Sequence, residues 1–178
     1  MTEINHKERA HAKLSASGAG RWATCPGSVQ MEDGIPDSES VYAKEGTLAH
    51  ELSELKLMHY LDPKGFGKRK LNAAVKKLKE NELYQTEMDS YTDSYVDFIK
   101  EKALSYSSQP YIEIEKRVDF SKWVEVGFGT CDCILMHGNT LSIIDLKYGK
   151  GVPVSAEQNE QLILYALGAY EAFSLIYQ

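Results

Sequence analysis

The chain has 178 residues, of which 43% are hydrophobic and 26% are charged, and its formal net charge is −6. This composition is typical of one globular domain, and the acidic balance excludes a generally basic nucleic-acid coat, although not a local basic groove. No run approaches the roughly 18 apolar residues that span a bilayer, the polar N-terminus is unlike a signal peptide, and the three cysteines argue against a disulfide framework. We therefore expect a cytoplasmic protein without membrane contact.

The N-terminal segment is predicted to be a flexible tail followed by a short helix. Residues 1–13 are polar and mixed in charge, and we expect them to form the tail. Ser15 or Ser17 is predicted to cap a helix that carries Trp22. The Cys-Pro-Gly sequence that begins at Cys25 would end this helix.

A longer helix is predicted over residues 40–61. Its apolar stripe has the spacing of a helix face and consists of Leu48, Leu52 and Leu55. Gly46 lies in mid-helix, where glycine costs about 1 kcal/mol relative to alanine, so we expect it to approach another backbone closely. His50 follows one turn later. Considered alone, it is more often a packed histidine with a local partner than a metal ligand.

The one strongly basic stretch lies over residues 62–82. Its basic residues are Lys64, Lys68, Arg69, Lys70, Lys76, Lys77 and Lys79. They form either a solvated helix face or a set of phosphate contacts, and the second alternative would make nucleic-acid binding depend on salt. An amphipathic helix is predicted next, over residues 87–106, and its apolar positions are assigned to the core.

The C-terminal part is predicted to be a three-stranded meander followed by a helix. Residues 111–120 alternate as a strand does, and Glu113 and Glu115 in this strand could contribute to a metal site, although solvent-facing strand acids are commoner. Residues 124–148 are predicted to form a hairpin, because Gly138 and Asn139 suit a two-residue turn of the primed type. The final helix is predicted over residues 156–177.

The hairpin carries an acidic pair and a lysine. With the predicted turn, Asp132 and Asp145 lie directly opposite each other on one face, and Lys147 shares that face. Opposed carboxylates among apolar neighbours need a compensating cation, and a divalent metal accepts carboxylate oxygens. The alternative is two acids exposed at a strand end, with Lys147 as a surface partner. Gln161 and Tyr165 share one face of the last helix and could point into a site above the hairpin.

In combination, these segments resemble the PD-(D/E)XK nuclease superfamily in its RecB-like and Cas4-like branch. The similar segments are LSASGAGRWATCPGS (14–28), EGTLAHEL (45–52), GTCD (129–132), IIDLKYG (143–149) and QLILYALG (161–168). More narrowly, the chain resembles the phage and prophage family known as DUF2800. Members of that family are usually longer, so the chain looks like an N-terminal half or a truncated form.

The resemblance implies a restriction-endonuclease-like α/β core, in which helices flank a central mixed β-sheet with an antiparallel meander. The expected organisation is a single domain over 14–178, with a helical part over 14–107 and a sheet-plus-helix core over 111–177. The implied activity is metal-dependent hydrolysis of DNA in the cytoplasm of a bacterial host cell, in an exonuclease or processing role beside phage recombination or replication proteins. The alternative is a non-catalytic nucleic-acid-binding or scaffold module that keeps the fold.

The resemblance also assigns roles to particular residues. The implied ligands of Mg²⁺ or Mn²⁺ are His50, Asp132, Asp145 and the Leu146 carbonyl. Lys147 would orient the attacking water or stabilise the transition state, and Gln161 and Tyr165 would position the strand or the lysine. Nucleic acid would contact Lys68, Arg69, Lys70, Lys76 and Lys77. Histidine is a softer ligand than Mg²⁺ prefers, which favours Mn²⁺ slightly.

The cysteines depart from the pattern of this branch. Many members hold an iron–sulfur cluster on one cysteine before the core and three after it. Cys25 matches the first, but no cysteine follows Cys133, so no iron–sulfur cluster is expected in this chain. Cys131 and Cys133 are both predicted to point away from the acidic face of the hairpin, as small core residues.

Overall fold

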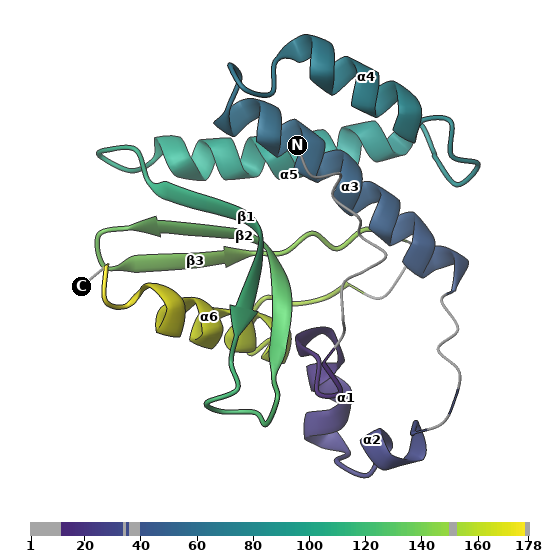
Figure 1. Ribbon diagram of the computed structural model, residues 1–178, viewed down its shortest axis with the longest axis vertical. Helices are drawn as coiled ribbons and strands as arrows, with labels where there is room; N and C mark the ends of the chain where they lie inside the picture. The colour runs from purple at the N-terminus through teal and green to yellow at the C-terminus, as the bar shows by residue number, and fades with distance from the viewer. Residues whose placement is uncertain (1–11, 34, 36–39, 150–152, 177–178) are drawn as a thin grey trace.

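Helices precede and follow a three-stranded β-sheet (Figure 1). The computed structural model describes residues 12–33, 35, 40–149 and 153–176. Its helical elements are the 3₁₀ turn η2 (Ala16–Gly18), α1 (Ala19–Thr24), α2 (Ser28–Met31), α3 (Val41–Leu61), α4 (Lys68–Leu78), α5 (Glu87–Leu104) and α6 (Glu160–Phe173). Its strands are β1 (Tyr111–Asp119), β2 (Phe128–His137) and β3 (Thr140–Ile144). None of the helices in this described part of the chain is both long and apolar enough to cross a membrane.

The sheet has the order β1-β2-β3, and both strand pairs are antiparallel. The meander is therefore confirmed, but the predicted mixed sheet is not found in the described residues. The reason is the length of the connections. A two-residue turn joins β2 to β3 and a short loop joins β1 to β2, whereas a parallel pair needs a crossover of about a dozen residues or more.

Two cores lie on opposite faces of the sheet. α3 and α5 cover one face, with α4 on their outer side, and α6 covers the other face together with η2 and α1 (Figure 1). The α3–α5 core is centred on fully buried residues that include Leu52, Leu57, Met88, Ile99 and Cys133. The α6 core includes Val118, Phe120, Cys131, Ile134 and Ala169.

Side-chain caps decide where several helices begin. Ser40 Oγ accepts the backbone N–H of Ala43 at 3.1 Å, which explains why α3 begins at Val41, close to the predicted start. Asn159 caps α6 in the same way, through the N–H of Leu162 at 3.1 Å, so this helix is shorter than predicted at its N-terminal end.

The N-terminal prediction is confirmed in part. Ser15 caps the 3₁₀ turn η2 through the N–H of Gly18 at 3.2 Å, whereas α1, which carries Trp22, begins directly after η2 without a side-chain cap of its own. α1 ends at Thr24, with Cys25 as its C-cap, as expected from the Cys-Pro-Gly sequence. The predicted tail lies outside the described residues except for Ala12 and Lys13, and Ala12 is buried.

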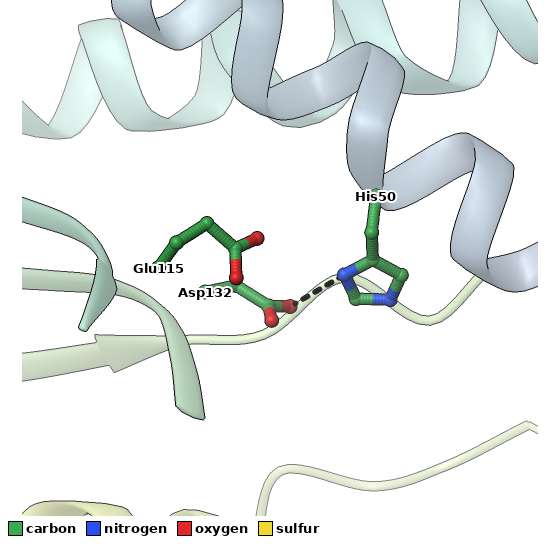
Figure 2. Close-up of side chains that lie close together, drawn as sticks. All are labelled: His50, Glu115 and Asp132. Carbon is green, nitrogen blue, oxygen red and sulfur yellow. Dashed lines mark ion pairs between the residues drawn. The ribbon is translucent and has the colours of Figure 1, made fainter. Parts of the chain in front are cut away.

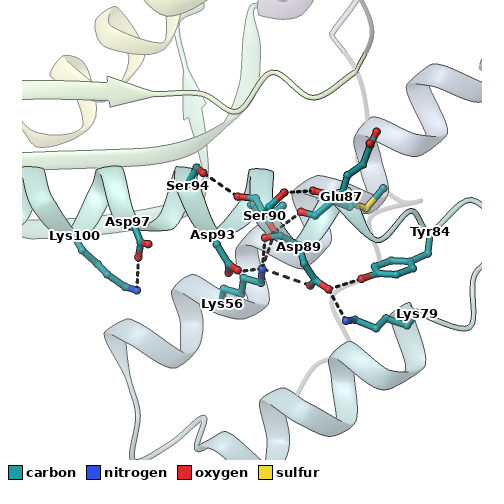
Figure 3. A network of polar contacts seen from close by, with 12 residues as sticks. Lys56, Lys79, Tyr84, Glu87, Asp89, Ser90, Asp93, Ser94, Asp97 and Lys100 are labelled. Carbon is teal, nitrogen blue, oxygen red and sulfur yellow. Dashed lines mark hydrogen bonds and ion pairs between the residues drawn. The ribbon is translucent and has the colours of Figure 1, made fainter.

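A polar network fastens α4 and α5 to α3 (Figure 3). Asp89 on α5 accepts hydrogen bonds from the Lys79 ammonium and the Tyr84 hydroxyl, both at 2.5 Å. Lys56 on α3 lies 3.7 Å from the same carboxylate and donates to Asp93 at 2.6 Å. Burial alone would raise the pKa of Asp89. The hydrogen bonds from Lys79 and Tyr84 and the charges of Lys79 and Lys56 outweigh burial and hold this pKa below its usual value.

The substitution Asp89→Asn is expected to lower the free energy of unfolding by about 1 kcal/mol at neutral pH, because it removes the charge that three groups share. A depressed pKa stabilises the folded state above the unfolded pKa of about 4, and this contribution is lost as the pH falls through the folded value. Urea unfolding at pH 7 and pH 3 measures the difference between variant and wild type, which should shrink at pH 3.

The control for this measurement is Asp97→Asn, because Asp97 pairs with Lys100 within α5 alone, at 2.9 Å. This exposed pair is expected to contribute only a few tenths of a kcal/mol. An equal loss of stability in the two variants would contradict a special role for Asp89.

Candidate metal centre

The β2–β3 hairpin has the predicted turn and register. Gly138 has φ of 53°, and Asn139 is not among the described residues with positive φ. Positive φ at the first central position alone is the requirement of a type II′ turn. His137 pairs with Thr140, and the same register continues to Cys133 and Ile144.

The ladder ends one pair before the two aspartates would meet. β3 ends at Ile144, and the Asp132 carboxylate accepts the backbone N–H of Leu146 at 2.7 Å. The Asp132 side chain on β2 thus accepts the first backbone N–H that could have continued the ladder beyond β3. Asp132 and Asp145 are therefore not a ladder pair, which corrects the prediction that they lie directly opposite each other.

The partner that the register places opposite Asp132 is Glu115 on β1. The pairs on either side, Ile114 with Cys133 and Lys116 with Cys131, are formed, and Glu115 lies between them with φ of 49°. A non-glycine residue with positive φ is uncommon and marks a local distortion of the strand.

This distortion interrupts the alternation of side chains in both strands. Ile114 packs with the α3–α5 core and Val118 with the α6 core, although unbroken alternation would place both on one face. Cys131 and Cys133 are divided between the two cores in the same way. They are buried core residues, as predicted, but they do not share a face, because the break lies between them. Burial raises the pKa of both thiols, and that of Cys133 to about 12.

His50, Glu115 and Asp132 meet at the break (Figure 2). They come from α3, β1 and β2, and one ligand atom of each lies within 4.8 Å of the other two. His50 Nδ1 is 3.3 Å from Asp132 Oδ2, and the side chains of these two residues are 28% and 11% exposed. Imidazole nitrogen and carboxylate oxygen in such proximity form a donor set that suits a divalent transition metal such as Mn²⁺.

The charges around His50 are dominated by carboxylates. Burial alone would lower the pKa of His50, but the hydrogen bond to Asp132 and the charges of Asp132, Glu115 and Asp145 outweigh it and raise this pKa. A site that attracts a proton to histidine in this way also attracts a metal cation, which competes with that proton for the same nitrogen.

Asp145 belongs to an adjoining network with the lysine. Lys147 Nζ lies 2.7 Å from Asp145 Oδ2 and donates to Gln161 Oε1 at 2.7 Å. The Gln161 amide group donates to Asp145 Oδ1 at 3.0 Å and to the Tyr165 hydroxyl at 3.3 Å. The structure thus brings together the four residues to which the resemblance assigned catalytic roles beside Asp132.

The surroundings of Asp145 also indicate whether the site suits a cation. Its side chain is only 5% exposed. Burial, followed by the charge of Asp132, raises the pKa of Asp145 despite the ammonium of Lys147 and the charge of His50. Among the described residues, Oδ2 of this buried carboxylate has the ion pair with Lys147 at 2.7 Å and no further hydrogen-bond partner. The residues present therefore fit a divalent cation, and ligation by Asp145 and by the Leu146 carbonyl stays a prediction.

Gly46 lies near another backbone segment, but not as close as predicted. A Cβ placed on Gly46 would lie 3.9 Å from the carbonyl oxygen of Tyr148, in the segment that follows Lys147, which is an ordinary van der Waals contact. α3 thus meets this segment one turn before His50.

The basic residues of α4 do not join the site. Lys68, Arg69, Lys70, Lys76 and Lys77 are exposed on α4, which lies on the outer side of α3, whereas the sheet lies on the inner side (Figure 1). Lys70 donates to the Gly65 carbonyl at 2.6 Å, which favours a solvated helix face for that residue. A role of these five residues in phosphate contact stays a prediction.

Glu115 is the residue whose importance the sequence did not establish. Glu113 and Glu115 look equivalent in the sequence, because both alternate with apolar residues. Glu113 accepts a hydrogen bond from the Tyr111 hydroxyl and lies 3.6 Å from Lys116. Of the two glutamates, only Glu115 lies opposite Asp132 in the register of β1 against β2. That register is the feature that could have distinguished them.

The family model described as "Protein of unknown function (DUF2800)" matches residues 11–178. No solved structure matches the chain.

Manganese is expected to stabilise the wild-type protein against heat. A ligand at about 100 times its Kd adds about 2.7 kcal/mol, which is roughly 5–10 °C in melting temperature for a chain of this size. Asp132→Asn and Glu115→Gln should each remove most of this shift, because each removes a charged ligand. Differential scanning calorimetry with and without Mn²⁺ measures it.

The matched control is Glu113→Gln, which changes an acid on the same strand outside the cluster. This variant should keep the full shift. Equal shifts in all four proteins would exclude the cluster of His50, Glu115 and Asp132 as the metal-binding site.

Proposed function

The chain belongs to the DUF2800 family, and we propose that it is a metal-dependent nuclease with a restriction-endonuclease-like core of the PD-(D/E)XK superfamily. One observation carries the proposal: the cluster of His50, Glu115 and Asp132 lies beside a network that joins Asp145, Lys147 and Gln161. An antiparallel meander with helices on both faces, which is the architecture of the described residues, supports this assignment of the fold.

The acidic cluster would hold Mg²⁺ or Mn²⁺. A phosphodiester is anionic, so a buried group of carboxylates without a cation would repel it. When bound, the metal would polarise the scissile phosphate and lower the pKa of a water molecule. His50, Glu115 and Asp132 would be its side-chain ligands, joined by Asp145 and the carbonyl of Leu146.

Lys147 would act directly on the substrate. Its side chain is 49% exposed, so its ammonium group can reach a bound phosphate while it remains tethered to Asp145. In that position it would stabilise the negative charge that develops in the transition state, or orient the attacking water.

Gln161 and Tyr165 would position this lysine. The amide nitrogen of Gln161 donates to both Asp145 and the Tyr165 hydroxyl, which leaves its carbonyl oxygen to accept from Lys147. The three contacts together fix the orientation of the amide group. Tyr165 is 5% exposed, so its hydroxyl is a rigid end point for the network.

The proposed substrate is DNA. The proposed setting is the cytoplasm of a bacterial cell, beside proteins of phage recombination or replication. This setting follows from the resemblance to phage and prophage proteins, whereas the carboxylate and lysine arrangement supports phosphodiester hydrolysis as such.

Wild-type protein is expected to cleave linear DNA in the presence of Mn²⁺ or Mg²⁺. Asp132→Asn and Lys147→Ala should each lower the rate by about 10²–10³-fold, because each removes a group that stabilises developing charge. Gln161→Ala should lower it by about 10–100-fold, as expected for a residue that positions another. Gel assays with end-labelled single-stranded and double-stranded DNA measure these rates.

The control is Lys100→Ala, an exposed lysine on α5 that pairs with Asp97 and should leave the rate unchanged. Equal cleavage by wild type, Asp132→Asn and Lys147→Ala would contradict the proposal. Binding of DNA without cleavage under either metal would instead favour the alternative, a non-catalytic nucleic-acid-binding or scaffold module.

A further inference from the structure

Two tyrosines lie at the segment that follows Lys147 and take no part in the network of Asp145, Lys147 and Gln161. Tyr148 follows Lys147 directly, and Tyr91 lies on α5. Their ring centroids are 5.9 Å apart, with 76° between the ring planes, which is an edge-to-face contact. Tyr148 packs partly against the α3–α5 core, whereas Tyr91 is 57% exposed. We call these two residues the tyrosine pair.

The tyrosine pair lies close to the ligands along α3. The carbonyl oxygen of Tyr148 faces Gly46, which precedes His50 by one helical turn. These four residues correspond to about 6 Å along the helix axis. A strand whose phosphate lies at His50 would therefore have its neighbouring base within reach of this pair.

The charges around the pair disfavour a phosphate there. Glu87 precedes Tyr91 by one turn of α5, so the two side chains share a face of that helix, and Glu45 directly precedes Gly46 on α3. Glu45 also accepts a hydrogen bond from Gln85 at 3.1 Å, which holds its carboxylate on this side of α3. A phosphate would be repelled by these acids, whereas an uncharged aromatic base would not.

On the basis of the proposed nuclease function, we infer that the tyrosine pair is a stacking platform for an unpaired base of the DNA strand whose phosphate lies at the metal centre. Every base has an aromatic face, so such a platform binds single strands with little regard to sequence. A base inside a duplex is already stacked on its neighbours. The platform therefore favours single-stranded ends over intact duplex.

The test measures cleavage of short single-stranded oligonucleotides, each with one abasic nucleotide at a different distance from the cleaved bond. At one position, loss of the base should lower kcat/KM of the wild type about ten-fold, mainly through KM, because stacking on that base is lost. Tyr91→Ala should show the same loss on the complete oligonucleotide and no further loss at that abasic position. Such non-additivity identifies a direct contact.

Two variants complete the design. Tyr91→Phe keeps the aromatic face and should cleave like the wild type. Tyr170→Ala is the matched control, because Tyr170 is similarly exposed, at 61%, but lies toward the other end of α6 from Gln161. Tyr91→Ala should also leave the salt dependence of DNA binding unchanged, since stacking displaces no counterions from phosphates.

The outcomes separate the two proposals. If the wild type cleaves but Tyr91→Ala has no effect, or its loss adds fully to that of every abasic position, the platform is excluded and the nuclease remains. If the wild type cleaves no oligonucleotide with either metal, the nuclease proposal fails, and the platform fails with it. The melting temperature of Tyr91→Ala should stay near that of the wild type, because the side chain is exposed.

Discussion

The site depends on how the chain holds the carboxylate of Asp132. This side chain is 11% exposed, and its Oδ2 both accepts the Leu146 N–H at 2.7 Å and lies 3.3 Å from His50 Nδ1. Removing an ion from water costs several kcal/mol, and only well-placed partners offset that cost. Asp132 therefore links three parts of the chain: β2, the segment after β3, and α3. Each of the other site residues lies in one of these parts or next to it.

The same requirement explains the irregularities of the sheet. The β2–β3 ladder stops at Ile144 because the next donor, the Leu146 N–H, is used by Asp132. β1 leaves regular strand geometry at Glu115, opposite Asp132, with a positive φ that costs energy in a non-glycine residue. Both departures lie at the carboxylate cluster, and sequences commonly break local rules where function requires it.

The regular parts of the structure could be predicted because local rules decide them. The limits of α3, the turn at Gly138 and the register of the hairpin follow from capping, turn chemistry and apolar spacing. The contacts of Gln161 with Lys147 and Tyr165 follow from helix periodicity once the hairpin is in place. Regular geometry therefore brings these residues together, although they lie far apart in the sequence.

The importance of Glu115 and the separation of Cys131 from Cys133 could not be predicted, because both depend on a break in alternation. Strand patterns assume a strict period of two, and a positive φ at one glutamate leaves no mark in the sequence. The predicted mixed sheet was wrong for a different reason. It came from the resemblance to a superfamily, whereas the short connections seen in the described residues permit antiparallel pairs only.

The networks around Asp89 and Asp145 differ in the direction in which they shift the pKa of their central carboxylate. Asp89 lies between Lys79 and Lys56, and its pKa is lowered even though burial opposes this. Asp145 also contacts a lysine, yet its pKa is raised, by burial and by the charge of Asp132. The first network is electrostatically satisfied by the chain itself and needs only to hold helices together. In the second, burial and the charge of Asp132 outweigh Lys147 and His50, and a bound divalent cation would favour the charged form of Asp145.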